Sequence, residues 1–376
     1  MASDLKPRVA QLIRLAEGGM KHHYISLIQG LLDSGIQVVA LCNFPPKDME
    51  GLEGFGATPL RFSMHSENHP LRDIHTVIRL VNILKEYRID VLHCHGFRAG
   101  LIGRIAAFLA RCNCIYTMHN FPPLGLSKGK RQIAGNIERY LSHITGKIIT
   151  VSEALKREAV DSMAIKEDKI GVIYNGISRP AGNKTLKKLR ESLGIDNDQV
   201  LIGTVARLIP SKGIDVLLDA IPFVNGKYPN VKFIILGDGP EESKLRGQAI
   251  KLNCNENIIF AGYKEYIWYY YDVFDIFLLP TLSEGLGISI IEALMVGLPV
   301  ISTRTGGVEE IIRHNYNGYL VPPGNSKELA RAILYFLAHP EKAKEYGRRG
   351  KELVKDKFHK ETMIRETLDL ILDVME

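Results

Sequence analysis

Residues 275–294, DIFLLPTLSEGLGISIIEAL, decide how this chain folds. A short apolar run ends at Pro280, a loop with two glycines follows, and apolar residues then continue into a helical segment. The same order of strand, loop and helix recurs along the whole chain. Short buried runs separated by helices are typical of βαβ units, whose parallel sheet is covered on both faces. The fold class is therefore predicted as α/β, with doubly wound parallel sheets.

The chain of 376 residues is expected to form two such domains, because a single core rarely extends over this length. The first is predicted to span 1–178 and the second 198–357, joined by a Lys-rich connection over 178–197. Ligands are expected at the carboxyl ends of the strands, in a cleft between the domains. The predicted strands are 9–13, 36–41, 90–95, 114–119, 147–151, 170–177, 200–205, 232–236, 258–261, 275–280 and 299–302.

The composition excludes several classes of protein. A hydrophobic content of 45% and a charged content of 24% rule out a disordered, collagenous or coiled-coil chain. The net charge of +6 fits phosphate-bearing ligands or an anionic lipid surface, and it is too small for a dedicated nucleic-acid binder. The five cysteines form no C-x-x-C pair, and neither a signal sequence nor a transmembrane stretch is visible. We therefore expect a cytoplasmic protein in a reducing compartment.

A pair of cations in the second half suggests a phosphate site. Arg207 and Lys212 lie in the loop after the strand at 200–205, and Gly213 then opens a helix. Two cations at this spacing can clamp a diphosphate. The alternative is that both are solvated loop charges, which the position at a strand-to-helix turn makes less probable.

Two carboxylates accompany the loop after the strand at 275–280. Glu284 lies in that loop, and Glu292 lies about two turns into the helix that follows. Carboxylates accept hydrogen bonds from vicinal hydroxyls such as those of a ribose or a hexose. The alternatives are a helix-dipole carboxylate for Glu284 and a surface charge for Glu292.

Three glycine-containing loops complete the candidate donor site. Gly285, Leu286 and Gly287 lead into the helix after Glu284, where free backbone N–H groups can bind anions and hydroxyls. Residues 237–240, with Gly239, and the pair Gly306-Gly307 follow two further strands. For both of these, a purely structural turn is at least as good an interpretation.

In the first half, Gly18 and Gly19 lie between the first strand and the first helix, where their N–H groups could meet a phosphate. His95 and His119 each close a strand, and two histidines at equivalent strand ends favour a polar ligand.

A zinc site at residues 93–95, His-Cys-His, is rejected. The two histidines share one face of the strand while Cys94 points away, and no further ligand cluster follows in the sequence.

The stretch 121–143 is a candidate membrane surface. Basic residues at 128, 130, 131 and 139 accompany apolar residues at 133, 137, 140 and 141. Such a helix can lie on an anionic leaflet, and it can equally pack its apolar stripe on the sheet.

Together these residues resemble the retaining glycosyltransferases of the GT-B fold, specifically glycosyltransferase family 4, over nearly the whole chain. The resemblance rests on residues 17–19, 175–176, 207–213, 237–240, 284–292, 306–307 and 317–322. Ala206, Thr281 and Leu286 depart from the family pattern, and Leu286, where Phe is commonest, puts the shape of the sugar pocket in doubt.

The resemblance implies a UDP-sugar or GDP-sugar donor held mainly by the second domain. It assigns Arg207 and Lys212 to the diphosphate, Glu292 to the ribose, and Glu284 with the N–H groups of Leu286 and Gly287 to the donor sugar. It also places the N–H of Gly19 at the diphosphate and His119 at the transferring sugar, both from the first domain. No metal or other cofactor is expected, and the last helix, in 358–376, should complete the first domain.

The predicted function is thus a retaining hexosyltransferase that acts on a saccharide or lipid-linked acceptor in polysaccharide or glycolipid biosynthesis. One alternative is a sugar-nucleotide 2-epimerase, for which no dedicated acid–base pair is visible. Another is a non-enzymatic two-domain binding protein. A dinucleotide dehydrogenase is disfavoured, because no G-x-G-x-x-G follows the first strand.

Overall fold

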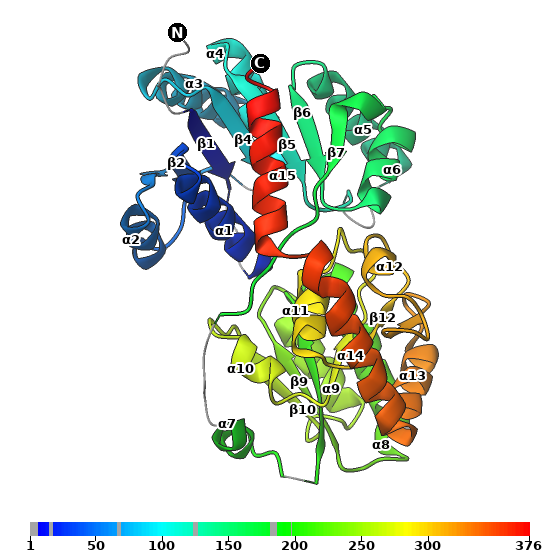
Figure 1. Ribbon diagram of the computed structural model, residues 1–376. Coiled ribbons are helices and arrows are strands. Elements are labelled where there is room, and N and C mark those ends of the chain that lie inside the picture. Colours follow the sequence, from blue (N-terminus) through cyan, green and yellow to red (C-terminus); the bar gives the residue numbers. More distant parts are fainter. Residues whose placement is uncertain (1–6, 15–17, 66–68, 123–126, 181–185, 197) are drawn as a thin grey trace. The chain divides into compact units, whose positions relative to one another are not determined.

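The structure is a computed structural model that describes residues 7–14, 18–65, 69–122, 127–180, 186–196 and 198–376 (Figure 1). The chain divides into two compact units. Unit 1 comprises residues 1–176 and 359–376, and unit 2 comprises residues 177–358. The stretch 178–197 belongs to unit 2, and its described part contains the helix α7 (Leu186–Ser192).

Unit 1 is built on a seven-stranded parallel sheet in the order β3-β2-β1-β4-β5-β6-β7. Its strands are β1 (Arg8–Ile13), β2 (Gln37–Cys42), β3 (Thr58–Arg61), β4 (Val91–His95), β5 (Asn113–Met118), β6 (Lys147–Thr150) and β7 (Ile170–Val172). Its helices are α1 (Gly19–Asp33), α2 (Pro46–Gly54), α3 (Pro70–Glu86), α4 (Phe97–Ala110), α5 (Lys128–Ser142), α6 (Glu153–Asp161) and α15 (Lys360–Asp373), with a short 3-10 turn, η1 (Glu167–Lys169).

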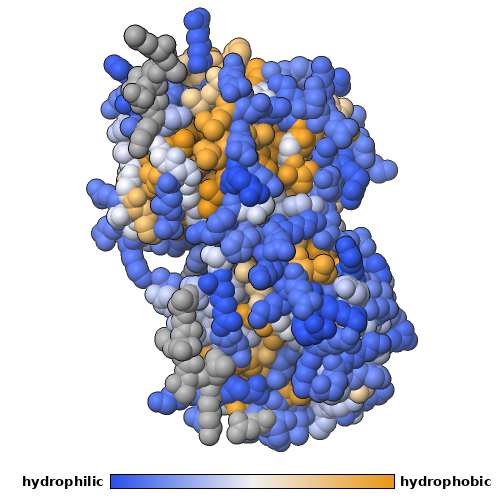
Figure 2. All heavy atoms as spheres, viewed as in Figure 1, coloured by the Kyte–Doolittle hydropathy of each residue, from blue (hydrophilic) through white to orange (hydrophobic). Residues whose placement is uncertain are grey.

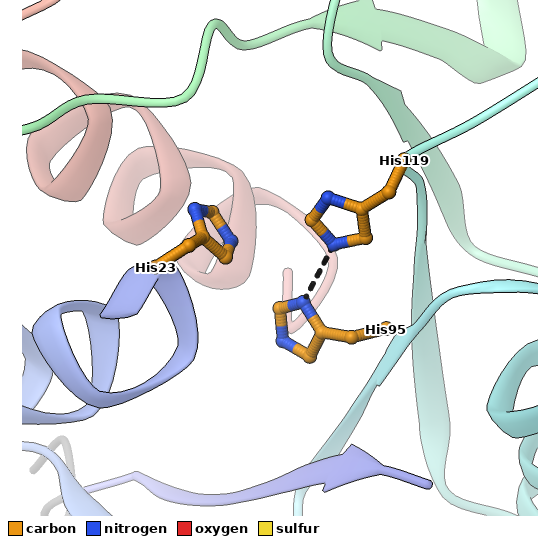
Figure 3. A group of neighbouring side chains, drawn as sticks. All are labelled: His23, His95 and His119. Atoms are coloured by element: carbon orange, nitrogen blue, oxygen red, sulfur yellow. Dashed lines mark hydrogen bonds between the residues drawn. The ribbon is translucent and has the colours of Figure 1, made fainter. Parts of the chain in front are cut away.

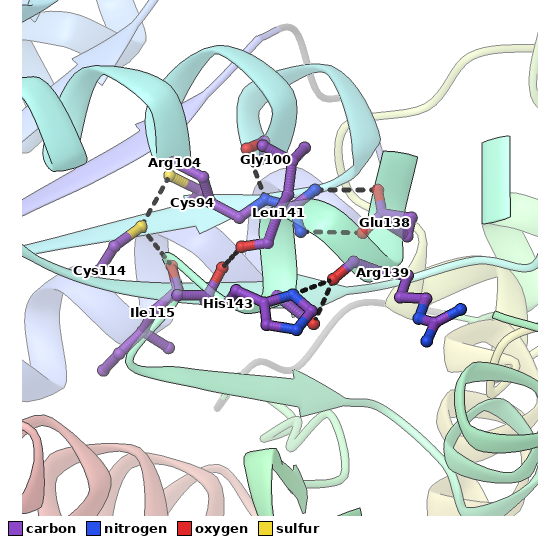
Figure 4. Close-up of polar contacts among 11 residues, drawn as sticks. Cys94, Gly100, Arg104, Cys114, Ile115, Glu138, Arg139, Leu141 and His143 are labelled. Carbon is purple, nitrogen blue, oxygen red and sulfur yellow. Dashed lines mark hydrogen bonds and ion pairs between the residues drawn. The ribbon is translucent and has the colours of Figure 1, made fainter. Parts of the chain in front are cut away.

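The two faces of this sheet are covered by different helices. On one face, Leu27 of α1 and Ile371 of α15 share a core with Val9 of β1 and Val38 of β2. In the view of Figure 2, hydrophobic residues of unit 1 are visible on either side of α15. On the other face lie α4 and α5, whose side chains are linked by a buried ion pair (Figure 4).

Unit 2 repeats the plan on a six-stranded parallel sheet in the order β10-β9-β8-β11-β12-β13. Its strands are β8 (Val200–Val205), β9 (Val231–Leu236), β10 (Ile258–Gly262), β11 (Ile276–Leu279), β12 (Val300–Thr303) and β13 (Tyr319–Val321). Besides α7, it contains η2 (Pro210–Lys212), α8 (Ile214–Asn225), α9 (Glu242–Lys251), α10 (Trp268–Tyr271), α11 (Ile288–Val296), α12 (Val308–Ile311), α13 (Ser326–Ala338) and α14 (Pro340–Lys357).

The doubly wound α/β fold predicted from the sequence is confirmed in each unit. The strand order reverses between β1 and β4 in unit 1 and between β8 and β11 in unit 2. Such a switch point opens a crevice at the carboxyl ends of the strands, where doubly wound folds bind their ligands. In the described ranges of the chain, no helix has both the length and the apolar character that a membrane span needs.

Candidate functional site

Two loops meet at the switch point of unit 2. The carbonyl oxygen of Ser211, in the loop after β8, accepts hydrogen bonds from the N–H of Leu282 (2.7 Å) and the hydroxyl of Thr281 (2.9 Å). Gly213 has a φ of 63°, and a Cβ there would lie 2.1 Å from the carbonyl oxygen of Pro280. Only glycine fits this close approach, so the two loops are held together at the end of β11.

This contact brings two predicted site residues together. The Nζ of Lys212 lies 2.6 Å from Oε2 of Glu284, and the two side chains are 19% and 9% exposed. The sequence assigned Lys212 to the diphosphate and Glu284 to the sugar, and it did not predict that they pair. An ammonium has three donors, so a lysine bonded to one carboxylate retains donors for an anionic ligand.

Arg207 lies in the same loop as Lys212 and is exposed. The loop is anchored to the turn after β9, because the N–H of Leu208 donates to the carbonyl oxygen of Asp238 at 2.7 Å. Gly239 has a φ of 156°, and a Cβ there would lie 2.5 Å from the carbonyl oxygen of Leu208. Gly239 thus allows the turn to approach the Arg207 loop, which supports the structural interpretation of this glycine.

The loop after β11 ends in the helix α11. Gly287 caps the helix, which begins at Ile288, and Gly285 and Leu286 are buried beside Glu284. The first N–H groups of an α-helix have no partner within the helix, and they carry the positive end of its dipole. The start of α11 can therefore bind an anionic or hydroxyl-bearing ligand, as predicted for Leu286 and Gly287.

Glu292 lies inside unit 2, in α11, and is 5% exposed. The surface-charge alternative for this residue is therefore wrong. The hydroxyl of Tyr271 donates a hydrogen bond to Oε2 of Glu292 at 2.8 Å. Burial raises the pKa of Glu292 to about 7, although the Tyr271 hydrogen bond acts in the opposite direction. The carboxyl group is thus balanced between its neutral and ionised forms near neutral pH.

In unit 1, histidines gather at the carboxyl ends of β4 and β5. His95 is the last residue of β4, and His119 directly follows β5. The Nδ1 of His95 lies 3.2 Å from Nε2 of His119 (Figure 3). The Nε2 of His95 lies 2.7 Å from Oε1 of Gln11 on β1. His23, from α1, packs edge-on against both imidazoles, with ring centroids 5.6 Å and 5.0 Å away.

Burial keeps these imidazoles uncharged. It lowers the pKa of His23 to about 4 and that of the neighbouring His93 to about 3. It also lowers the pKa of His95 and of His119 well below the usual value. The group therefore offers neutral donors and acceptors at pH 7. The thiol of Cys94 lies on the opposite face of the sheet, 4.0 Å from that of Cys114, in agreement with the rejected His-Cys-His site.

The remaining predicted residues of unit 1 lie at its switch point. Gly18 caps α1, which begins at Gly19, so both lie at the N-terminus of a helix that follows β1. Glu17 lies outside the described residues, as do residues 123–126 of the candidate membrane stretch. The predicted site residues thus fall into two groups, one in each unit.

Sequence reasoning missed Gln11, His23 and Tyr271. His23 lies four residues before Leu27, which is in the core, so its position on the inward side of α1 is a usable signal. For Gln11 and Tyr271 the contact arises only from tertiary structure.

A cavity of about 600 Å³ lies beside α3 in unit 1. Arg72, His75 and Arg79 of α3 line it, together with Ser63 and His65 from the segment after β3. This composition suits an anionic group.

Two family models match the chain. The model "Glycosyl transferases group 1" matches residues 186–353, and "Glycosyltransferase Family 4" matches residues 17–179. An uncharacterized glycosyltransferase of Methanocaldococcus jannaschii is 30% identical over 73% of this chain and 73% of its own length.

Two further similar proteins have names or structure descriptions that mention a UDP-sugar. The UDP-Gal:alpha-D-GlcNAc-diphosphoundecaprenol alpha-1,3-galactosyltransferase of Escherichia coli is 28% identical over 70% of each chain. The crystal structure of Anabaena Alr3699/HepE in complex with UDP-glucose superimposes with a TM-score of 0.81 at 24% identity, covering 96% of this chain and 99% of that one.

Proposed function

This chain belongs to the glycosyltransferases of the GT-B fold, and from that premise we propose that it moves a hexosyl group from a nucleoside-diphosphate sugar to a saccharide or lipid-linked acceptor. The observation that carries the proposal is the Lys212–Glu284 pair beside the start of α11. It combines a cation and helix N–H groups for a diphosphate with a carboxylate for sugar hydroxyls. Polysaccharide or glycolipid assembly is the proposed setting.

The donor is proposed to be a UDP-sugar or a GDP-sugar. Arg207 and Lys212 bind the diphosphate, and Glu292 accepts hydrogen bonds from the ribose hydroxyls. Two similar proteins support a uridine donor: one is named for UDP-Gal, and the other was crystallised with UDP-glucose. The two cations take the place of a divalent metal at the diphosphate, so transfer should proceed in the presence of a chelator.

The transfer is proposed to retain the anomeric configuration without a covalent glycosyl-enzyme. Stabilisation of the departing diphosphate by Arg207, Lys212 and helix N–H groups supplies most of the rate enhancement. Analysis of the product by NMR tests this step. A product with the inverted anomeric configuration would refute it.

Unit 1 is proposed to bind the acceptor, with His95 and His119 as polar contacts at the strand ends. The cavity lined by Arg72 and Arg79 fits a phosphate-bearing acceptor. The Escherichia coli relative is named for an acceptor that carries its sugar on a lipid diphosphate. A lipid-linked diphosphate is therefore the preferred acceptor class.

Peripheral binding to an anionic membrane is proposed through α5. Ile133, Ile137 and Tyr140 are 62%, 37% and 75% exposed, so these three do not pack on the sheet. Leu141, the fourth member of the predicted stripe, is buried. Exposed apolar side chains beside the basic residues Lys128 and Lys130 suit an anionic leaflet.

A thermal-shift panel of UDP-, GDP- and ADP-sugars in EDTA tests the proposed function. A bound donor stabilises the native state by mass action, so the correct base should raise the melting temperature most. Transfer of labelled sugar from that donor to a lipid-diphosphate saccharide should follow. If no nucleotide sugar shifts the melting temperature, the proposed function fails.

A further inference from the structure

Three histidines of unit 1 converge from three different elements. His23 comes from α1, His95 from the end of β4 and His119 from the residue after β5 (Figure 3). They are 7%, 2% and 6% exposed, and one ring nitrogen of each lies within 4.8 Å of the others. We propose that His23, His95 and His119 form a site for one divalent transition-metal ion, of which Zn²⁺ is the representative.

The placement of the ligands follows from the sheet. Side chains at alternate positions of a strand share a face, and Val91 and Ile115 belong to the core beneath α1. His95 and His119 lie four residues further along their respective strands, on that same face. His23 lies on the side of α1 that faces this core, so three imidazoles meet where α1 covers the carboxyl end of the sheet.

The spacing of two ligands already suits a tetrahedral ion. Zinc–imidazole bonds of about 2.0–2.1 Å place two ligand nitrogens about 3.3 Å apart. The Nδ1 of His95 and Nε2 of His119 are 3.2 Å apart. The third ligand, His23, must move closer. Among the described residues, neither of its buried ring nitrogens has a hydrogen-bond partner, so such a movement breaks no hydrogen bond of the ring.

A carbonyl group behind one imidazole fixes its tautomer. With Oε1 of Gln11 at 2.7 Å, Nε2 of His95 carries the hydrogen and donates it, which leaves the lone pair of Nδ1 directed toward the other histidines. Metal-bound histidines are commonly oriented in this way by an oxygen acceptor at the second nitrogen.

Binding of the ion would replace the contact between the two strand histidines. Because Nε2 of His95 carries its ring hydrogen, the hydrogen in the 3.2 Å contact belongs to Nε2 of His119, and it would move to Nδ1 of His119 when Nε2 binds the ion. A bound ion would also satisfy one of the two buried ring nitrogens of His23, which otherwise has no hydrogen-bond partner among the described residues.

This site differs from the one that the sequence excluded. Of residues 93–95 only His95 is a ligand, and the other two ligands are 72 residues upstream and 24 residues downstream of it. The inference does not rest on the proposed donor site, because all ligands belong to unit 1 and the diphosphate cations belong to unit 2. Three protein ligands leave a fourth position for water or for a hydroxyl group. With the ion bound, His95 and His119 would therefore contact the acceptor through this fourth position.

The test uses the full chain, stripped with a chelator and titrated with Co²⁺ and Zn²⁺. We expect one ion per chain, visible absorption bands of tetrahedral Co²⁺, and displacement of Co²⁺ by Zn²⁺. His23→Gln should weaken Zn²⁺ binding at least tenfold, while the control His93→Gln, a buried neighbour bonded to Thr117, should leave the affinity unchanged. Absence of stoichiometric binding, or equal loss in both variants, would overturn the proposal.

A measurement on the unmodified protein covers the case in which a variant fails to fold. In ¹⁵N-histidine NMR spectra, Zn²⁺ should shift the ring nitrogens of three histidines by the amount typical of direct coordination. Nine other histidines are present as internal references, since the chain has 12 in total. If the exposed histidines shift and the buried ones do not, the site does not exist.

Discussion

Two ion pairs, one in each unit, show how differently this protein uses buried charge. In unit 1, Arg104 of α4 binds Glu138 of α5 through two hydrogen bonds of 2.9 Å, and the side chains are 0% and 4% exposed. The Nε of Arg104 donates to the carbonyl oxygen of Gly100 at 2.8 Å (Figure 4). Its guanidinium lies 4.2 Å from the centre of the Tyr116 ring. The charged groups of this pair therefore contact each other and neighbouring groups within unit 1.

The pair in unit 2 is simpler and more open. Lys212 and Glu284 make a single contact of 2.6 Å, and both lie on loops at the ends of strands. Helices hold the first pair, whereas loops at the carboxyl ends of strands, where doubly wound folds bind their ligands, hold the second. Burial does not by itself distinguish a charge that can bind a ligand from one that only supports the fold. Each of the three guanidinium nitrogens of Arg104 has an acceptor within unit 1, whereas the ammonium of Lys212, with three donors, makes one recorded bond.

Breaking the pair in unit 1 should have the largest effect. Arg104→Met leaves Glu138 as an uncompensated buried carboxylate, and removing one partner of such a pair costs about 3–5 kcal/mol of unfolding free energy. Urea denaturation checks this value. The matched control is Arg348→Met in the exposed pair with Glu352, which should change the unfolding free energy by less than about 1 kcal/mol. Equal effects of the two variants would remove the distinction between them.

Breaking the pair in unit 2 should reduce turnover while the chain stays folded. Lys212→Met removes a charged hydrogen bond to the donor, worth about 1.5–3 kcal/mol, or roughly a ten- to hundredfold loss in kcat/KM. Since Lys212 contacts Glu284, the losses of Lys212→Met and Glu284→Gln should not add in the double variant. Wild-type kinetics for Lys212→Met, or strictly additive losses, would contradict this assignment.

Glu292, also in unit 2, is a buried carboxylate that is hydrogen-bonded to Tyr271 and belongs to neither of these two ion pairs. Its pKa of about 7 lies above the unfolded value of 4.5, so folding takes up a proton between these two pH values. Stability from this group is therefore present below pH 4.5 and is lost as pH rises through about 7. Donor affinity should change in the opposite sense, because the ionised form is the better acceptor for ribose hydroxyls.

Glu292→Gln should abolish both dependences, and thermal unfolding and donor titrations at pH 6 and pH 8 measure them. A wild-type donor affinity that does not rise over this interval would refute the ribose assignment. Tyr271→Phe removes only the hydrogen bond that lowers the pKa of Glu292 and leaves the burial that raises it. This substitution should therefore raise the pKa of Glu292 further.

The smallest effects are expected on the surface of α5. Each cation near an anionic leaflet contributes about 1 kcal/mol. The Nη2 of Arg131 lies 2.6 Å from Oε1 of Glu158, so the charge of Arg131 is already partly compensated. Arg131→Ser should therefore weaken binding to anionic vesicles less than Lys130→Ser does. Co-sedimentation at low salt measures both. If the variant with Lys128, Lys130 and Arg131 all replaced by Ser binds like the wild type, the membrane proposal fails.

The sequence was sufficient for most of the fold. Long apolar runs predicted the central strands, because parallel strands buried on both faces need continuous hydrophobic residues. It did not predict β3 (Thr58–Arg61) or β13 (Tyr319–Val321). These two lie at the ends of their sheets and are four and three residues long, which is too short for a periodic pattern to stand out.

The candidate site was predictable where chemistry is local in sequence. Arg207, Lys212 and Glu284 lie in glycine-containing loops after strands, Glu292 lies in the helix that follows one of these loops, and the topology then places the loops at one edge. The Lys212–Glu284 contact spans 72 residues and depends on the tight approach of Gly213 to Pro280. Gln11 and Tyr271 were missed for the same reason, since only tertiary packing gives them their hydrogen-bond partners.

Isothermal titration calorimetry of the protein with UDP and with GDP, both in EDTA, is the most direct test of whether unit 2 binds a diphosphate through Lys212. We expect that one of the two nucleotides binds with one site per chain, and that Lys212→Met weakens the affinity for this nucleotide at least tenfold. Lys344→Met, at an exposed lysine of the same unit paired with Glu341, should bind the nucleotide like the wild type. If neither nucleotide binds, or if Lys212→Met binds as tightly as Lys344→Met, the proposed diphosphate site is wrong.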